Sequence, residues 1–271
     1  MTEVPLQNIK LAHGMLAWRE AGTGPPLVLL HGIGSGSGSW DGALAELSKT
    51  WRVIAWDAPG YGGSAPLVES APLAAHYAAA LENFLHQRAP WPLVLVGHSL
   101  GAIVAAAVAA RHEITVNALV LVSPALGYGQ AAAEVRESKY RERLTMVDQL
   151  GIAGMAAQRS AALCAPGASA SCIEAVRQNM ALATVGGYKQ AAYMLAHDDL
   201  LSHLRQVQIP TAVMCGEHDT VTPPDACRQV AVAVGAPYTS LRGVAHACYV
   251  EDPAQFNAAL MKVLSALPAH V

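Results

Sequence analysis

Short apolar runs recur along this chain and alternate with longer segments in which apolar residues follow helical spacing. Runs of this length are typical of strands that are buried on both faces, as in a parallel sheet. We expect such strands at residues 27–30, 51–56, 92–96, 119–122 and 210–215, and a last one at 238–241. Helical spacing predicts helices at residues 40–48, 72–86, 102–110 and 253–266. The alternation predicts an α/β fold with a mostly parallel central sheet flanked by helices and joined by right-handed crossovers.

One part of the chain breaks this alternation. Between residues 126 and 205 no good strand pattern occurs, and Gly and Pro separate four helical segments at 131–150, 152–164, 171–183 and 188–204. We therefore expect a core formed by residues 1–125 and 206–271, with residues 126–205 inserted as a helical cap, or lid. An insertion at the carboxyl end of a sheet strand lies where the ligand crevice of such sheets forms.

Composition narrows the class of protein. The chain has 271 residues, of which 53% are hydrophobic and 14% charged, so intrinsic disorder is excluded. Lys and Arg number 17 against 20 Asp and Glu, which leaves no basic footprint for nucleic acid. The longest apolar stretch, residues 91–110, is interrupted by Pro92, Gly97, His98 and Ser99, so we expect no membrane span.

Cysteine usage and the first residues indicate a compartment. The five cysteines are an odd number and form no CxxC pair, which is typical of free thiols. The first ten residues contain no basic segment followed by an apolar core, so no secretory signal is expected. We expect a cytoplasmic protein that is a monomer or a homodimer.

The strongest chemical motif is Gly97-His-Ser-Leu-Gly101, a G-x-S-x-G pattern between a predicted strand and a predicted helix. A sharp strand-to-helix turn needs Gly on either side and lifts the central residue above the sheet. The helix amino terminus behind it favours developing negative charge. Ser99 is therefore the candidate nucleophile.

A serine nucleophile needs a base, and the base needs a carboxylate to orient it. His246 lies in the loop between the last predicted strand and the final helix, where a base reaches the serine. Asp219 directly follows the predicted strand at 210–215. Two other carboxylates lie nearby. Glu217 is too close to the strand end to reach far, and Asp225 follows two prolines and is expected to be a helix N-cap.

The oxyanion hole requires two backbone amides. We expect one from Leu100, the residue after the nucleophile, and the other from Ile33 in the glycine-rich loop after the first buried strand. His31 is expected to brace that loop, and Asp57 to stabilise a turn. No His/Cys cluster has metal spacing and the chemistry needs no cofactor, so none is expected.

The predicted cap supplies candidate substrate-binding residues. Its basic residues at 136, 139, 141 and 143 alternate with Glu137 and Glu142, which favours a solvated helix face. Arg159 stands out in a small, apolar helix as a candidate carboxylate clamp. The pocket candidates, for which packing between cap and core is an equal alternative, are Met146, Met155, Leu163, Met180, Tyr188 and Met194. Of these, we select Tyr188 and Met155, together with Arg159, as substrate-binding residues.

The motifs together resemble the α/β-hydrolase superfamily over nearly the whole chain. The matching stretches are His31-Gly-Ile-Gly, Asp57-Ala-Pro-Gly-Tyr-Gly-Gly-Ser, Gly97-His-Ser-Leu-Gly, Gly216-Glu-His-Asp-Thr-Val-Thr-Pro and Val244-Ala-His. The chain order Ser99, Asp219, His246 is the order of that superfamily. Within it, the chain looks most like the 3-oxoadipate enol-lactonase group and its carboxylesterase-like relatives. The resemblance implies that the family's triad and oxyanion positions correspond to Ser99, Asp219, His246, Ile33 and Leu100.

The resemblance implies a serine hydrolase that cleaves a carboxylic ester or lactone through an acyl-enzyme, with a small-molecule substrate and no nucleic-acid or membrane partner. A general carboxylesterase and a C–C bond hydrolase of aromatic ring-cleavage products are the alternatives. The second is disfavoured because Ala245-His246-Ala247 lacks the aromatic residue that usually follows the histidine in that group. A ligand-sensing receptor on the same fold is a third alternative. Cys248, two residues after His246, is expected to be exposed and to make activity sensitive to thiol reagents.

Overall fold

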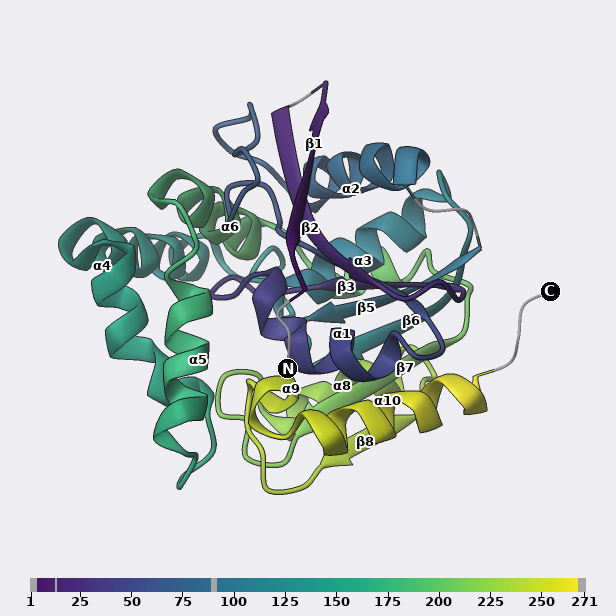
Figure 1. The fold of residues 1–271 in the computed structure, drawn as a ribbon. Coiled ribbons are helices and arrows are strands. Elements are labelled where there is room, and N and C mark those ends of the chain that lie inside the picture. The colour runs from purple at the N-terminus through teal and green to yellow at the C-terminus, as the bar shows by residue number, and fades with distance from the viewer. Residues whose placement is uncertain (1–3, 13, 89–91, 268–271) are drawn as a thin grey trace.

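The computed structural model describes residues 4–12, 14–88 and 92–267. In this part of the chain one sheet of eight strands runs in the order β1-β2-β4-β3-β5-β6-β7-β8 (Figure 1). Its strands are β1 (Leu6–Leu11), β2 (Gly14–Ala21), β3 (Pro26–Leu30), β4 (Arg52–Trp56), β5 (Leu93–His98), β6 (Val116–Val122), β7 (Thr211–Gly216) and β8 (Tyr238–Leu241). The six strands from β3 onward pair in parallel, as the sequence predicts.

The sequence did not predict the hairpin of β1 and β2. These strands pair with each other antiparallel, and β2 pairs antiparallel with β4. Most of β1 is exposed or half-buried because it lies at the edge of the sheet. An edge strand needs no continuous apolar run, so the pattern that identifies the central strands is missing here.

The strand side chains alternate between two hydrophobic layers. Leu27 and Leu29 of β3 pack in one layer with helices α1 (Asp41–Leu47) and α10 (Pro253–Ala266). Val28 and Leu30 pack in the other with α2 (Ala74–Arg88), α3 (Leu100–Arg111) and α8 (Pro224–Ala233). In Figure 1, α2 and α3 lie above the sheet, and α1 and α10 lie below it. This two-sided burial explains why the central strands are apolar at consecutive positions.

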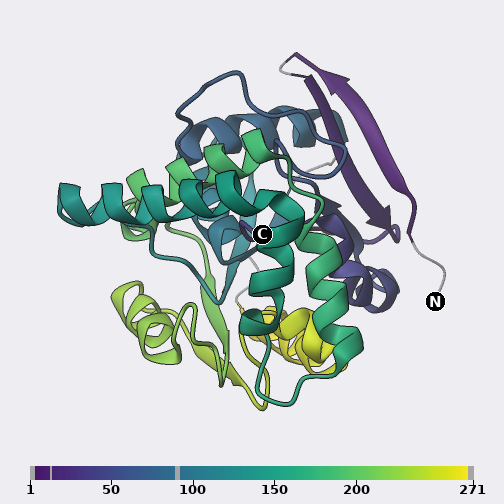
Figure 2. The same cartoon turned by 90° about the vertical axis from the view of Figure 1, so that its left-hand side faces the viewer.

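Residues 126–205, called here the helical segment, form helices between β6 and β7. These are α4 (Ala133–Arg159), the 3-10 helix η2 (Ser160–Leu163), α5 (Ala170–Met180), α6 (Val185–His197) and α7 (Leu200–Leu204). Figure 2 shows α4, α5 and α6 in front of the sheet. The two helices predicted at 131–150 and 152–164 meet where the sequence analysis divides them. Gly151, with a φ of +64° and a ψ of 177°, interrupts the helical backbone between the two halves of α4, and such a φ suits glycine.

Backbone hydrogen bonds join the helical segment to the core. Thr184 N donates to Gly60 O (2.9 Å), Gly62 N to Leu182 O (2.9 Å), and Ala247 N to Leu163 O (2.9 Å). The last bond holds the residue that follows His246. Among the described helices, none combines the length and the apolar character that crossing a bilayer requires.

Three short elements complete the fold. The 3-10 helix η1 (Ser37–Trp40) precedes α1, and α9 (Cys248–Glu251) precedes α10. Helix α8 begins at Pro224 with Pro223 in the N-cap position, whereas the sequence analysis expected Asp225 to be the N-cap of a helix here. Asp225 therefore lies in the first turn of α8 and is not its N-cap, because the prolines already start the helix.

Candidate active site

Ser99 occupies the turn between β5 and α3 with a strained backbone. Its φ is +52° and its ψ is −116°, a backbone conformation that residues other than glycine rarely adopt. A Cβ on Gly97 would overlap the backbone of Gly101 and Ala102, and one on Gly101 would overlap the carbonyl of Leu30. Strain of this kind costs about 1–3 kcal/mol. The tight packing of this turn maintains it and presents Ser99 at the carboxyl end of the sheet.

Asp219 and His246 meet at the ends of the neighbouring strands. Asp219 follows β7, His246 follows β8, and His246 Nδ1 lies 2.9 Å from Asp219 Oδ2. A carboxylate accepts, so Nδ1 carries the hydrogen and Nε2 is left as the basic nitrogen. His246 and Ser99 line the same cavity. The fold thus brings together three residues that are separated by up to 147 positions in the chain.

The surroundings of Asp219 keep its carboxylate ionised. Oδ1 accepts hydrogen bonds from the amides of Val221 (2.8 Å) and Thr222 (2.9 Å), and Thr222 Oγ1 lies 2.8 Å from Oδ2. Burial by itself raises the pKa of Asp219. The hydrogen bond and the charge of His246 and the Thr222 amide outweigh it and lower the pKa to about 2.

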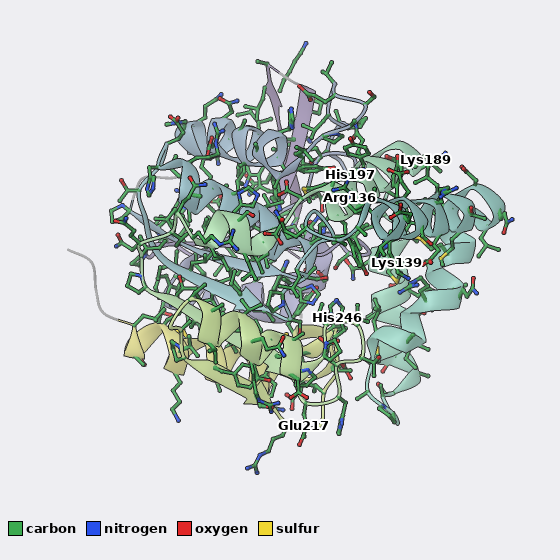
Figure 3. All side chains as sticks on the ribbon, turned by 180° about the vertical axis from the view of Figure 1, so that it is seen from behind. Arg136, Lys139, Lys189, His197, Glu217 and His246 are labelled. Carbon is green, nitrogen blue, oxygen red and sulfur yellow. The ribbon has the colours of Figure 1, made fainter. Side chains whose placement is uncertain are left out.

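The alternative carboxylates lie elsewhere. Glu217 accepts from the amide of Gly243 (3.0 Å), and Figure 3 shows it well away from His246. Asp225 is exposed and pairs with Arg228 (2.6 Å).

His98 contacts the backbone of His246, which the sequence analysis did not predict. Its Nε2 lies 2.9 Å from the carbonyl oxygen of His246, and its Nδ1 lies 3.4 Å from the Tyr249 hydroxyl. Burial and the neighbouring His246 hold the pKa of His98 well below its usual value. A neutral His98 with its hydrogen on Nε2 donates to His246 O and accepts from Tyr249. His98 therefore fixes the backbone of the base.

The loop after β3 lies beside the nucleophile. A Cβ on Gly32 would approach Cβ of Ser99 to 3.0 Å, and Ile33 lines the cavity. Tyr61 donates a hydrogen bond to Ile33 O (2.7 Å). His31 braces the loop as expected: its Nδ1 donates to Gly32 O (2.8 Å), and its Nε2 accepts from Ala58 N (3.0 Å). As the first residue of α3, Leu100 has no earlier helical turn to receive its amide.

Asp57 stabilises the same region. Its Oδ1 accepts from Ser37 N (2.8 Å) and its Oδ2 from Gly63 N (3.3 Å), so this carboxylate connects two loops and lies outside the cavity lining. The turn-stabilising role expected from the sequence agrees with these bonds.

The cavity has a volume of about 630 Å³ and is lined by core and helical-segment residues alike. Arg159 and Tyr188 line it, as do Met146, Leu163 and Met180. Met155, which the sequence analysis selected for substrate binding, is fully buried in the hydrophobic core and does not line the cavity, and the same holds for Met194. Their apolar character reflects packing between helices, the alternative that helical spacing left open.

Two basic residues of α4 that were expected in solvent also line the cavity. These are Lys139 and Arg143, both half-buried. They are spaced four residues apart, and Met146 follows three residues later, so all three share one face of α4. That i, i+4, i+7 spacing is the sequence signal that could have placed Lys139 and Arg143 beside Met146 at the cavity. The alternation with Glu137 and Glu142 suggested a solvated face instead.

The expectation for Cys248 is wrong. This thiol is only 1% exposed, and burial raises its pKa well above the usual value. Cys248 begins α9 and packs in the hydrophobic layer that contains α1 and α10, so proximity to His246 in sequence does not place the thiol in the cavity.

Comparison with known proteins places this architecture among known hydrolases. A family model described as the alpha/beta hydrolase fold matches residues 25–256. A pimeloyl-[acyl-carrier protein] methyl ester esterase of Vibrio vulnificus is 29% identical over 268 residues, which cover 89% of this chain and 94% of that protein. A putative carbamate hydrolase, RutD, of Escherichia coli O157:H7 is 28% identical over 259 residues, with coverages of 91% and 93%. The enol-lactonase of Burkholderia xenovorans LB400 superposes with a TM-score of 0.82 at 20% identity over 96% of this chain and 100% of that one.

Proposed function

Because this chain belongs to the alpha/beta hydrolase fold family, we propose that it is a serine hydrolase that cleaves a carboxylic ester or lactone through an acyl-enzyme. The observation that carries the proposal is the 2.9 Å contact between His246 Nδ1 and Asp219 Oδ2, beside a strained Ser99 in one cavity. Nucleophile, base and orienting carboxylate are the three parts that acyl transfer by serine requires.

In the proposed mechanism, Ser99 Oγ attacks the substrate carbonyl carbon while His246 Nε2 takes its proton. Asp219 holds the imidazole and stabilises the imidazolium. The amides of Ile33 and Leu100 bind the oxyanion of the tetrahedral intermediate, and each such donor contributes about 3 kcal/mol in comparable sites. His246 then gives the proton to the leaving oxygen. Water, activated by the same histidine, attacks the acyl-enzyme and releases the acid.

The helical segment has a part in this proposal as a cap. Its residues Leu163, Met180 and Tyr188 line the cavity above Ser99 and limit the access of water. The hydrogen bond from Ala247 N to Leu163 O joins this roof to the loop of the base. The volume of about 630 Å³ suits a small-molecule ester or lactone.

Among substrates, 3-oxoadipate enol-lactone remains the first candidate from the sequence motifs, and a simple carboxylic ester is the alternative. The esterase relative at 29% identity favours an ester, whereas the lactonase likeness at 20% identity supports only the fold. Both reactions use the same acyl-enzyme chemistry, so the site geometry serves either one.

The test is steady-state hydrolysis of 3-oxoadipate enol-lactone, 4-nitrophenyl acetate and 4-nitrophenyl butyrate by wild type and Ser99→Ala. Loss of the nucleophile is expected to lower kcat by at least about a thousandfold. Ser265→Ala, a matched change on the exposed side of α10, is expected to leave activity unchanged. Turnover of any of these substrates that survives in Ser99→Ala contradicts the mechanism. Turnover of the aryl esters alone identifies a general carboxylesterase.

A further inference from the structure

The lining of the cavity above Ser99 contains more positively charged side chains than negatively charged ones. Three cationic side chains line it, Lys139, Arg143 and Arg159, against one surface carboxylate, Glu142. Lys139 and Glu142 neutralise each other, with Nζ 3.0 Å from Oε2. The carboxylate of Asp219 is fully buried beneath His246 and is already paired with it. The guanidinium groups of Arg143 and Arg159 therefore remain as the excess charge.

Neither guanidinium forms an ion pair with a described residue, although Arg143 is near enough to Glu142 to help Lys139 lower the pKa of that carboxyl. Arg143 donates to the carbonyl of Lys139 (2.9 Å) and lies over the ring of Tyr128 (5.8 Å), contacts that leave its charge in place. Arg159 forms no hydrogen bond or ion pair with the described residues. Both arginines are half-buried in the cavity lining, so each guanidinium can reach a bound ligand.

The two arginines line the same cavity as Tyr188, and both lie near its phenol. Both act on the phenol of Tyr188, where burial raises the pKa and the positive charges of Arg143 and Arg159 oppose it. Arg143 comes from the first half of α4 and Arg159 is its last residue, with the kink at Gly151 between them, and both line the cavity. Two guanidinium groups and a phenol thus converge on one region.

On the basis of the proposed function, we infer that Arg143 and Arg159 form an anion subsite, and that the natural substrate is an ester or lactone carrying a free carboxylate. A guanidinium binds a carboxylate through two parallel N–H···O bonds, and Tyr188 is placed to donate a further one. The subsite lies on the helical segment and Ser99 lies on the core. The carboxylate therefore enters the cap end of the cavity while the scissile carbonyl lies at the sheet.

Binding to Ser99→Ala protein tests the subsite without any turnover. The probes are monomethyl glutarate and its neutral counterpart dimethyl glutarate, compared by isothermal titration calorimetry. The monoanion is expected to bind at least about tenfold more tightly, a difference of about 1.4 kcal/mol. Arg159→Gln in the Ser99→Ala background is expected to abolish that preference, and it removes no internal contact that would endanger folding.

Turnover by the otherwise wild-type enzyme gives the second readout. The acyl-side pair is mono-4-nitrophenyl glutarate and 4-nitrophenyl methyl glutarate, and the alcohol-side pair is 4-acetoxybenzoate and methyl 4-acetoxybenzoate. In at least one pair, Arg143→Gln and Arg159→Gln are expected to raise KM for the anionic member about tenfold or more and to change kcat/KM of the neutral member less than twofold. Arg141→Gln is the matched control, because Arg141 lies on α4 outside this cavity.

The outcomes separate this inference from the proposed function. Equal binding of the two glutarates, or equal effects of Arg159→Gln on the neutral and anionic members of both pairs, overturns the anion subsite even if Ser99 is required for turnover. Loss of Ser99 dependence overturns the proposed function, whereas the calorimetric preference for the monoanion stands or falls by itself. A preference that Arg141→Gln abolishes as strongly as Arg159→Gln also overturns the assignment, since it reflects the general charge of α4.

Discussion

Replacing Thr222 by valine tests how the carboxylate of Asp219 is held. Thr222 Oγ1 lies 2.8 Å from Asp219 Oδ2, 3.0 Å from Ser123 O and 3.3 Å from His246 Nδ1. One hydroxyl proton serves these neighbours, and an ionised carboxylate is the strongest acceptor among them, so we expect it on Asp219. Valine keeps the branched shape and removes the donor. The backbone amide of Thr222 still reaches Oδ1.

The expected loss of stability in Thr222→Val follows from the electrostatics of Asp219. The pKa of Asp219 falls from 3.8 to about 2, which corresponds to about 2 kcal/mol of stability at neutral pH. His246 and the backbone amide of Thr222, which the variant keeps, account for part of this shift, and the hydroxyl adds one hydrogen bond to a charged group, which contributes roughly 1.5–3 kcal/mol. Because the folded pKa is depressed, the contribution is complete above the unfolded pKa near 3.8 and disappears as the pH falls through 2.

Urea unfolding followed by tryptophan fluorescence between pH 7 and pH 2.5 measures the difference. Thr222→Val is expected to be about 2 kcal/mol less stable than wild type at pH 7, and the two unfolding free energies are expected to converge toward pH 2. Thr222→Ser restores the donor and is expected to recover most of the loss. A gap that stays constant with pH would refute the reasoning, because it would mean that the hydroxyl donates to Ser123 O. At pH 7, kcat/KM of Thr222→Val is expected to fall far less than that of Asp219→Asn. Replacing the corresponding aspartate by asparagine in a serine protease lowers kcat by about 10⁴.

Two further predictions concern residues around His246. His98→Ala removes the hydrogen bond to the carbonyl of His246, so kcat/KM is expected to fall about fivefold, the equivalent of one hydrogen bond of about 1 kcal/mol. His98→Gln is expected to recover part of this loss. Steady-state kinetics, with thermal unfolding as the folding control, measures both variants, and equal losses in the two contradict a positioning role. Iodoacetamide is expected to leave wild-type activity unchanged, because Cys248 is buried and its thiol has a raised pKa. Peptide mass spectrometry after treatment checks this, and a modified Cys248 together with lost activity would show the burial argument to be incorrect.

Much of the fold follows from local pattern. The strands β3 to β7 are apolar at consecutive positions because helices cover both faces of the sheet, so the chain itself marks them. The final strand and helix were predicted at the bounds that the structure shows, Tyr238–Leu241 and Pro253–Ala266. The hairpin of β1 and β2 escaped prediction because an edge hairpin needs only part of an apolar face. The N-cap expected at Asp225 lies two residues too late, because the prolines already start α8.

For the candidate site, the sequence determined the residue types and their order, since Ser99, Asp219 and His246 each follow a strand end that the apolar runs mark. Only the tertiary structure decided which neighbours these residues have. Thr222 against His246, and His98 against the carbonyl of His246, are contacts between segments whose relative positions no local pattern records.

The same division explains the errors in the helical segment. Helical spacing identifies a buried face without saying whether a core or a cavity lies against it. Met155 therefore packs in the core, while Lys139 and Arg143 face the cavity despite their charged surroundings. Sequence alone determined which residues can perform acyl transfer and that they meet at one edge of a parallel sheet. The packing of α4 over that edge decided the charge and shape of the space in front of them, because a cavity is a property of surfaces that come together only when the chain folds.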